Sequence, residues 1–402
     1  MSELDVDVAV VGAGPAGSVA AMELAKRGVK VLVLEKRQEI GAPKRCAEGI
    51  NVTALNALGL GADGRWAVNE INGAVLYSPS MKSVTISSPE LRGYILERKM
   101  FEKHLAAEAV KAGARYMVKT TVTDVIRDAG GKVAGVKAEY MGEEVTVHSK
   151  VVIAADGVDS MTAKRAGIDT VNHLIDYHSG FQYEMAGVSG IDERKLHIFF
   201  GNEIAPKGYV WIFPKGNTVA NVGIGIVGVK SEEGNRARDY LDRFIKNNPR
   251  FFGNASPIEI NSGGIPVSAS ADTFVGDGIM AVGDAAQQVN PIHGGGIALA
   301  MSAARIAADV TATAISEGDT SRERLEDYET RWREADGARM RRLMRLRTFL
   351  ERLEDSDVEK LADILQGDDL MKLIKGETTF MLKLLATKAP KMLPLARKFL
   401  GS

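Results

Sequence analysis

Blocks of apolar and polar residues predict a strand, a helix and a second strand within the first 35 residues. Val6 to Val11 form a short apolar run, which is typical of a buried parallel strand. Ala16 to Lys26 carries helix-forming residues with apolar side chains at helical spacing, and Gly28 follows as the expected C-terminal cap. A second apolar run, Val29 to Leu34, ends in Glu35. The pattern predicts a β-α-β unit.

Three glycines, Gly12, Gly14 and Gly17, separate the first strand from the helix in the spacing G-x-G-x-x-G. Gly12 permits a tight turn, Gly14 lets a pyrophosphate approach the helix N-terminus, and Gly17 lets helix and strand pack closely. Glu35 lies 18 residues beyond Gly17 and can accept hydrogen bonds from a ribose. This order predicts a dinucleotide site; a glycine-rich turn in an ordinary α/β unit is the alternative.

The polar, glycine-bearing stretch 36–49 reads as a loop at the carboxyl end of the second strand, where ligands lie in open α/β sheets. A helix is expected to begin near Arg98, and residues 116–126 alternate like one strand. Residues 133–147 suggest a hairpin. The apolar stretch 150–160 predicts a further strand that breaks at Asp156-Gly157.

Composition changes after about Ile168, where short β-like runs with turns between them predict a separate, inserted sheet. The runs are 181–188, 196–200, 208–213 and 218–227. Gly223, Gly225 and Gly228 repeat the glycine spacing, but they lie in an alternating strand pattern with no second strand and acid after them. We therefore predict no second nucleotide fold for NADPH.

Residues 279–304 repeat the pattern of the first residues of the chain. A buried strand, a loop with three glycines and a small-residue helix starting near Gly296 are expected there. From Glu323 onward the pattern is helical and charged.

Composition narrows the class of protein. The chain has 402 residues, of which 45% are hydrophobic and 26% charged, as in folded globular proteins. A net charge of −1 gives no reason to expect nucleic acid as a partner. Cys46 is the single cysteine, so we expect no intrachain disulfide and a reducing cytoplasm. We see no signal peptide and no apolar run of the roughly 18–20 residues that span a bilayer. Membrane contact would be peripheral, on the inner face of the cell membrane.

Three motifs together resemble FAD-dependent oxidoreductases of the aromatic-hydroxylase superfamily: GAGPAG at 12–17, ADG at 155–157 and VGDAAQQVNPIHGGGIALA at 282–300. The resemblance implies that Asp284 binds ribityl or ribose hydroxyls and that backbone N–H groups near the last helix start face the flavin pyrimidine edge. It implies that Ala16 holds the pyrophosphate, Arg98 reaches the cofactor and Val122 meets the adenine. The remaining implied FAD contacts are Cys46, Ala47, Gly49, Gly295, Gly296 and Ile297.

The resulting fold class is α/β, with a Rossmann-like FAD-binding domain, an inserted antiparallel-sheet substrate domain and a C-terminal helical region. We assign residues 1–168 plus 271–318 to the discontinuous FAD-binding domain, 169–270 to the substrate domain and 319–402 to the helical region.

Two local features resemble the geranylgeranyl reductase family, and its archaeal digeranylgeranylglycerophospholipid reductase branch most. One is Tyr209-x-Trp211-x-Phe213-Pro214-Lys215 followed by Asn221-Val222-Gly223, and the other is RCAEG at 45–49. The family saturates isoprenoid double bonds. The resemblance therefore implies an isoprenoid lipid substrate in archaeal membrane-lipid synthesis. Substrate contacts are expected at Tyr209, Trp211, Phe213 and Pro214, where ordinary sheet core is the alternative.

Protonation of an isolated trisubstituted alkene would give a tertiary carbocation, to which reduced flavin could deliver a hydride. Such chemistry needs a dry tunnel with aromatic walls. The proton donor is left open between Cys46 and His293. A lipid head group would lie near a cation such as Lys372 or Lys375, and the basic C-terminus suits anionic lipid, with a solvated helix face as the alternative.

Two rival functions are carried with this one. A flavin-dependent monooxygenase, either a hydroxylase or an epoxidase, shares the superfamily, and a non-catalytic prenyl-binding protein shares the fold. The electron donor also stays open between ferredoxin and an NAD(P)H-linked partner.

Overall fold

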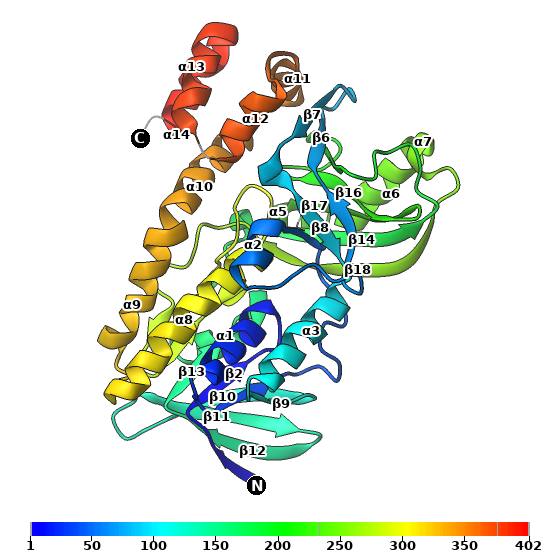
Figure 1. The fold of residues 1–402 in the computed structure, drawn as a ribbon. Helices are drawn as coiled ribbons and strands as arrows, with labels where there is room; N and C mark the ends of the chain where they lie inside the picture. Colours follow the sequence, from blue (N-terminus) through cyan, green and yellow to red (C-terminus); the bar gives the residue numbers. More distant parts are fainter. Residues whose placement is uncertain (1, 233, 376, 401–402) are drawn as a thin grey trace.

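The computed structural model describes residues 2–232, 234–375 and 377–400. The chain builds a parallel sheet near its N-terminus, a larger sheet beside it, and a helical region at the far end that holds the C-terminus (Figure 1). The α/β fold class predicted from the sequence is confirmed.

Strand β2 lies inside the first sheet, and all four of its residues are buried. Its continuous apolar run is typical of a strand that is covered on both faces. β2 pairs in parallel with β13 and β3, and only β19 runs antiparallel at one edge. In spatial order the strands are β19 (Val275–Gly276), β20 (Ile279–Ala281), β13 (Val151–Ala154), β2 (Val8–Val11), β3 (Val31–Leu34) and β9 (Arg115–Met117).

Helix α1 (Pro15–Lys26) follows β2 directly and packs between α3 (Arg98–Lys111) and α8 (Ile297–Glu317), as Figure 1 shows. Gly28 has a φ of 77° just beyond the end of α1, which is the backbone conformation that favours glycine there. The predicted strand-helix-strand opening and the predicted helix start at Arg98 are confirmed.

Two smaller sheets flank this region. One contains β1 (Ser2–Asp5), β12 (Glu143–His148), β11 (Val133–Tyr140) and β10 (Thr120–Arg127), and the other contains β4 (Gly49–Asn51), β8 (Gly93–Leu96) and β5 (Ala67–Ile71). The single strand predicted over 116–126 was wrong: β9 and β10 belong to different sheets. A turn at Lys119, with a φ of 55°, separates them.

The larger sheet has seven strands, and the four predicted runs form its centre. In order they are β18 (Ser256–Pro266), β14 (Tyr177–Ala186), β17 (Val219–Val227), β16 (Tyr209–Gly216), β15 (Leu196–Phe199), β6 (Gly73–Tyr77) and β7 (Ser83–Ser87). Strands β6 and β7 come from the range 1–168, and β6 pairs with β15 in parallel. The sheet thus takes strands from both predicted domains, and the domain boundaries themselves stay a prediction.

One face of the seven-stranded sheet is covered by α6 (Ala237–Asn247) and α7 (Pro249–Phe252). Val210 and Ile212 of β16, with Val222 and Ile224 of β17, are buried in one cluster with Leu241 and the other side chains of these helices. Because side chains alternate along a strand, the intervening residues of β16 and β17 point to the opposite face. That opposite face is left for the site.

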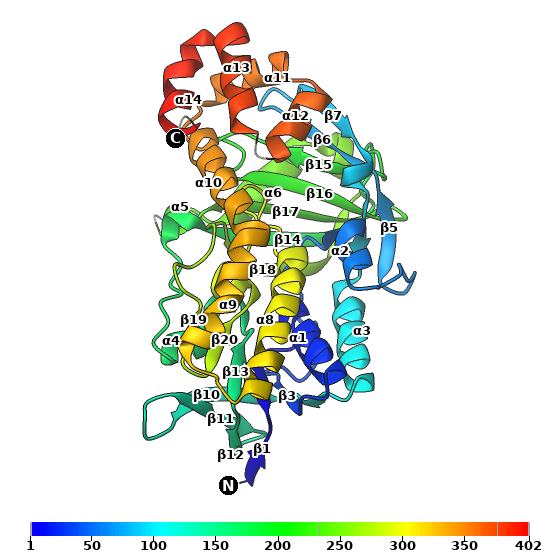
Figure 2. The same ribbon diagram turned by 60° about the vertical axis from the view of Figure 1, so that its left-hand side comes forward.

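The C-terminal helices continue from α8. Helix α9 (Arg322–Trp332) passes through a π-turn at 333–337 into α10 (Ala338–Leu350), and Figure 2 shows both beside α8. Four further helices share a hydrophobic cluster with the end of α10: α11 (Asp355–Ile364), α12 (Gly367–Ile374), α13 (Thr378–Lys388) and α14 (Leu393–Leu400). The remaining short helices are α2 (Val52–Ala57), α4 (Met161–Arg165) and α5 (Gly228–Glu232).

Among the described residues, only α8 is long and apolar enough to cross a bilayer. Its most apolar stretch is 56% buried inside the protein, and it packs against α1 and α9. This packing is that of a core helix.

Arg347 ties α10 to the seven-stranded sheet. Its side chain is 5% exposed and pairs with Asp176 at 2.8 Å and with Glu351 at 2.5 Å. It also donates to the carbonyl oxygens of Val267, at 2.7 Å, and Ile175. Removing one partner of a buried ion pair leaves an uncompensated charge, so loss of the Arg347 side chain should be strongly destabilising.

Replacing Arg347 with Met is therefore expected to lower the free energy of unfolding by roughly 3–5 kcal/mol, measured by urea denaturation. Arg342→Met, on the exposed face of the same helix, is the matched control and should change it by about 0.5 kcal/mol or less. Equal stability of the two variants would contradict the tether.

Candidate active site

The glycine turn after β2 leaves no room for side chains at two of its three glycines. Gly12 has a φ of 101°, and a Cβ there would lie 2.4 Å from the carbonyl oxygen of Ala155. A Cβ at Gly17 would lie 1.9 Å from the carbonyl oxygen of Gly12. At Gly14 a Cβ would meet nothing within 4 Å, and no side chain caps the N-terminus of α1. The helix end is open to an anion such as a pyrophosphate.

Glu35 lies at the carboxyl end of β3 and is 9% exposed. Its Oε2 accepts a hydrogen bond from the backbone N–H of Ala13 at 2.9 Å, and its Oε1 accepts one from Arg37 at 2.9 Å. These bonds hold the carboxylate beside the glycine turn. Each oxygen keeps a lone pair, so the position fits recognition of a ribose hydroxyl.

The late motif meets the early one at the same edge of the sheet. A Cβ at Gly283 would lie 3.1 Å from the Cβ atoms of Ala16 and Ala300, so the end of β20 touches the start of α1 and of α8. A Cβ at Gly296, the residue before α8, would lie 2.7 Å from Oδ1 of Asp284. The structure thus brings 12–17 and 283–297 together, as the sequence motifs predicted.

Asp284 and Arg98 are close enough for their charges to interact. Burial raises the pKa of Asp284, and the charge of Arg98 opposes that shift. Asp284 keeps some solvent contact, and within the described residues its carboxylate accepts no hydrogen bond. Arg98, at the first turn of α3, donates from Nε to Glu102 at 2.5 Å. These two groups are placed to bind polar parts of one ligand.

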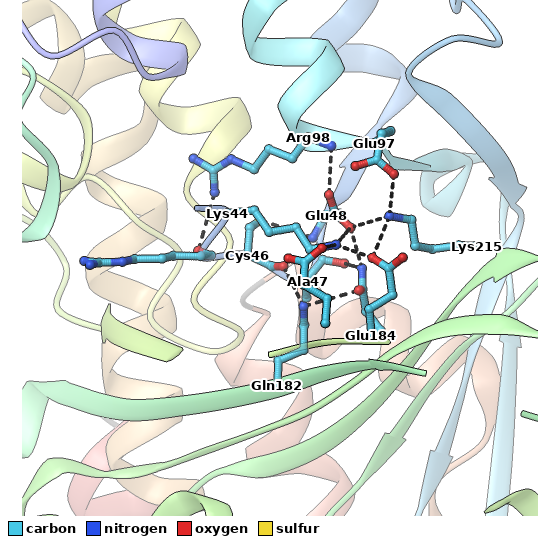
Figure 3. A network of polar contacts seen from close by, with 12 residues as sticks. Lys44, Cys46, Ala47, Glu48, Glu97, Arg98, Gln182, Glu184 and Lys215 are labelled. Atoms are coloured by element: carbon cyan, nitrogen blue, oxygen red, sulfur yellow. Dashed lines mark hydrogen bonds and ion pairs between the residues drawn. The ribbon is translucent and has the colours of Figure 1, made fainter. Parts of the chain in front are cut away.

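The loop that carries Cys46 lies against the seven-stranded sheet (Figure 3). Gln182 Nε2 donates to the Cys46 carbonyl oxygen at 3.1 Å, and Asn221 Nδ2 donates to that of Ala47 at 3.2 Å. The Cys46 Sγ accepts a hydrogen bond from the backbone N–H of Glu48 at 3.1 Å. The thiol is thereby held beside the face of the sheet that α6 and α7 leave uncovered.

The aromatic side chains of β16 line that face. Tyr209 and Trp211 have ring centroids 5.8 Å apart, and those of Trp211 and Phe213 are 6.5 Å apart. The indole N–H of Trp211 donates to Gln182 Oε1 at 2.9 Å, and its ring lies over Gly223, where a Cβ would come within 2.3 Å of it. We call Tyr209, Trp211 and Phe213 the aromatic stripe.

Both ends of the aromatic stripe contact predicted cofactor loops. A Cβ at Gly49 would lie 3.5 Å from the Phe213 ring, and the Tyr209 hydroxyl donates to the carbonyl oxygen of His293 at 2.7 Å. Pro214 is buried and, one position after Phe213, points to the opposite face of the strand.

His293 has an unusual environment. Its Nδ1 accepts a hydrogen bond from the backbone N–H of Gly295 at 3.1 Å. The residue is exposed, so solvent reaches the ring. Neighbouring protein atoms, together with the charge of Arg339, lower its pKa.

Val122 is in β10, and its carbonyl accepts a hydrogen bond from Arg165 at 3.1 Å. The first residue of that strand, Thr120, donates its N–H to the carbonyl oxygen of Glu35 at 2.8 Å, and the adenine contact of Val122 stays a prediction. The two predicted head-group cations already have partners: Lys372 lies over the Phe380 ring at 4.3 Å, and Lys375 pairs with Glu90 at 2.9 Å. Both belong to α12 or its cap, which packs on β7. Strand β7 is three strands from the aromatic stripe, roughly 14 Å at the usual spacing.

Sequence reasoning missed the polar residues that hold the Cys46 loop. Glu48 and Lys215 stood inside quoted motifs without a role, and the alternation of β14 could have placed Gln182 and Glu184 on one face. His178, on the same face, is 7% exposed, and its Nε2 has no hydrogen-bond partner within the described ranges. It lines a small crevice with members of the aromatic stripe and His293.

One pocket lies apart from this region. It has a volume of about 180 Å³ and lies among Arg127, Gly167 and Asp277, with no motif residue in its lining.

If Asp284 holds FAD hydroxyls, Asp284→Asn should weaken FAD binding about tenfold, as expected for a lost hydrogen bond to a charged group. The apoprotein should instead melt at a higher temperature near pH 7. A carboxyl whose folded-state pKa is raised costs stability as pH rises through that range, and an amide does not ionise. Titration with FAD and thermal melts of the apoprotein at about pH 5 and 7 test both; unchanged FAD affinity would contradict the role.

Comparisons with known proteins agree with this geometry. A family model described as an FAD binding domain matches residues 5–342. A digeranylgeranylglycerophospholipid reductase of Methanothrix thermoacetophila is 45% identical, covering 96% of this chain and 97% of the relative. One of Methanocaldococcus jannaschii is 43% identical, covering 96% of each chain.

Among solved structures, a geranylgeranyl bacteriochlorophyll reductase-like protein from Thermoplasma acidophilum superposes with a TM-score of 0.90. It is 38% identical, over 99% of this chain and 100% of that one. The residues of the glycine turn, Glu35 and Asp284 fit FAD, and the protein is a flavin-dependent oxidoreductase. The chain belongs to the FAD-binding digeranylgeranylglycerophospholipid reductase family.

Proposed function

We propose that this protein saturates the isoprenoid double bonds of geranylgeranyl chains on a glycerophospholipid, in archaeal membrane-lipid synthesis. The observation that carries the proposal is the aromatic stripe, which contacts the Cys46 loop at one end and the 290–296 segment at the other. The names of the full-length relatives support the substrate class.

Reduction of an isolated alkene needs a proton on one carbon and a hydride on the other. FAD, when bound and reduced, supplies the hydride. Positive charge develops on the more substituted carbon, and the faces of Tyr209 and Trp211 carry negative quadrupole density that stabilises it. The hydrogen bond from Trp211 to Gln182 fixes the orientation of the indole ring. The stripe also excludes water, which would otherwise trap the cation.

We propose Cys46 as the proton donor in preference to His293. The pKa of His293 is lowered from its usual value, which favours the neutral ring near pH 7, and its Nδ1 already accepts a hydrogen bond. Transfer from Cys46 would break its S–H bond, form a C–H bond on the substrate and leave a thiolate that solvent reprotonates.

Bound flavin and oxygen consumption distinguish the proposed reductase from a prenyl-binding protein and from a monooxygenase. The open helix end at Gly14, with Glu35 and Asp284 beside it, supports a bound flavin over a non-catalytic prenyl-binding protein. A monooxygenase would couple turnover to oxygen consumption, whereas saturation proceeds with reductant and no oxygen.

The electron donor is proposed to be an external ferredoxin or an NAD(P)H-linked partner. Gly223 and Gly225, which repeat the nucleotide-binding spacing, lie inside β17 of the seven-stranded sheet. Their position in a strand supports a packing role, in which a residue without a side chain leaves room for the ring of Trp211. It therefore supports an external electron donor over a second nucleotide site in this chain.

Peripheral contact with the inner face of the cell membrane is proposed to be electrostatic. Basic residues of α13, α14 and their connection are exposed, including Lys383, Lys388, Lys391 and Arg397. The apolar side chains of the same helices, such as Leu385 and Met381, are buried in a common cluster. These exposed cations support electrostatic attraction to anionic lipid.

Anaerobic incubation with dithionite and a geranylgeranyl glycerophospholipid is expected to add about two mass units per saturated double bond and to reoxidise the flavin. Mass spectrometry of the lipid and the visible spectrum follow both changes. Oxygen-dependent addition of about 16 mass units would favour the monooxygenase instead, and a protein that cannot be loaded with FAD would favour the binding protein.

Cys46→Ala is expected to lower kcat about 10²–10⁴-fold, the usual contribution of a general acid, while the FAD spectrum stays unchanged. The parent should also show no inflection in kcat between about pH 5.5 and 7, where an ordinary histidine titrates. Full turnover by Cys46→Ala, or a histidine-like inflection abolished by His293→Asn, would exclude Cys46 as the acid.

A further inference from the structure

Four buried ionic side chains meet where the Cys46 loop crosses the seven-stranded sheet. We call Lys44, Glu48, Glu184 and Lys215 the clamp (Figure 3). Their side chains are 3%, 0%, 13% and 6% exposed, respectively. The Nζ atoms of Lys44 and Lys215 lie 3.2 and 3.0 Å from Oε2 of Glu48. Both lysines also contact Glu184, with Lys215 at 3.0 Å.

The two lysines and Glu184 are stabilised in their charged forms. Burial opposes the ammonium form of Lys44, but Glu48 and Glu184 outweigh it and raise its pKa. Burial likewise opposes the ammonium form of Lys215, but Glu48, Glu97 and Glu184 raise its pKa. Burial opposes the carboxylate of Glu184, yet its two lysine partners lower its pKa. Glu97, which is 36% exposed, also pairs with Lys215 at 2.8 Å. Lysines with raised pKa values are poor proton donors, so the clamp fits a positioning role and not a proton relay.

Glu48 is the centre of the clamp. Besides the two lysines, its Oε2 accepts a hydrogen bond from Asn221 Nδ2 at 2.7 Å. Its Oε1 accepts one from the backbone N–H of Arg98 at 2.7 Å. Its backbone carbonyl accepts from the N–H of Leu96. The residue has a φ of 74°, a costly conformation for a side chain other than glycine, which persists only where surrounding contacts hold it.

This held conformation fixes the direction of one particular N–H group. It is the Glu48 N–H that donates to Cys46 Sγ at 3.1 Å. The same carboxylate accepts a hydrogen bond from the backbone N–H of Arg98, whose charge lowers the pKa of Asp284. One buried carboxylate therefore sets the position of both the thiol and the start of α3.

We propose that Glu48 is a positioning residue, which, through the clamp, holds the Cys46 thiol in its reactive orientation beside the aromatic stripe. The reactive orientation rests on the function proposed above. The ion pairs of the clamp connect the loop at 44–48 with residue 184 of β14 and residue 215 of β16. They therefore fix the loop to the sheet.

The thiol itself gives a readout that needs neither lipid nor turnover. Cys46 is the single cysteine of the chain, so alkylation by iodoacetamide reports on this site alone. In Glu48→Gln the clamp loses one negative charge, and the loop should loosen. We expect Cys46 alkylation in the FAD-loaded protein to change by about tenfold or more and kcat to fall by about tenfold or more. KM for the lipid should change by less than about threefold.

Two further variants separate positioning from simple charge burial. Glu48→Gln combined with Lys44→Met removes one negative and one positive charge and so keeps the parent's net charge. The thermal melt should therefore recover while the alkylation rate and kcat stay altered. Glu259→Gln removes a 45% exposed carboxylate 3.5 Å from Lys44. As a matched control it should leave alkylation within about twofold of the parent.

Parental alkylation and turnover in Glu48→Gln would overturn the proposal, and so would recovery of both in the double variant. If Glu48→Gln does not fold, Asn221→Ala replaces it, because that change removes a donor to Glu48 and Ala47 without burying a new charge. Its parental alkylation rate would likewise overturn the proposal. An altered alkylation rate in a protein that reduces no geranylgeranyl lipid would keep the positioning role and reject the proposed function.

Discussion

Backbone-to-backbone contact at the carboxyl edge of the parallel sheet is the constraint on which the rest of the structure depends. Only glycine at 12 and 17 lets the end of β2, the start of α1 and the Ala155 backbone touch. As a result, the uncapped N-terminus of α1 lies next to the segment that carries Asp284. Because β20 ends at the same edge, the 283–297 segment closes over it. A dinucleotide can be held there mainly by backbone groups and a few carboxylates.

The second sheet supplies what the first lacks. Its uncovered face carries the aromatic stripe, and polar side chains of β14, β16 and β17 hold the Cys46 loop against it. An apolar reaction space thus lies beside a network of buried, compensated charges. Such a network costs desolvation free energy, and a hydrophobic replacement would often be as stable. Its use here is to fix geometry at the contact between the two sheets.

Much of the fold was predictable because the signals are local. Apolar runs, glycine spacing and helix starts identify β2, α1, β3 and α8, and the superfamily motifs place Asp284 near the glycine turn. Residues 73–87 could not be assigned to the seven-stranded sheet, since nothing in a short strand names its partner. Residues 116–126 alternate like one strand, and the turn at Lys119 has no glycine to mark it.

The site was predictable where motifs carry it and not where long-range contacts do. Glu48 meets Lys215 across 167 positions, and a sequence gives no sign of that pairing. The proposed head-group lysines show the converse case. Their charge was visible in the sequence, but their existing partners, Phe380 and Glu90, were not.

We expect one FAD to be bound by the glycine turn and the 283–297 segment, with the alkene between it and the aromatic stripe. A crystal structure of the protein holding FAD and a geranylgeranyl phospholipid tests this arrangement. A substrate double bond should then lie within roughly 3–3.5 Å of the flavin N5 and against the Trp211 side of the site. An isoalloxazine ring remote from residues 283–297, or a lipid chain bound away from β16, would contradict it.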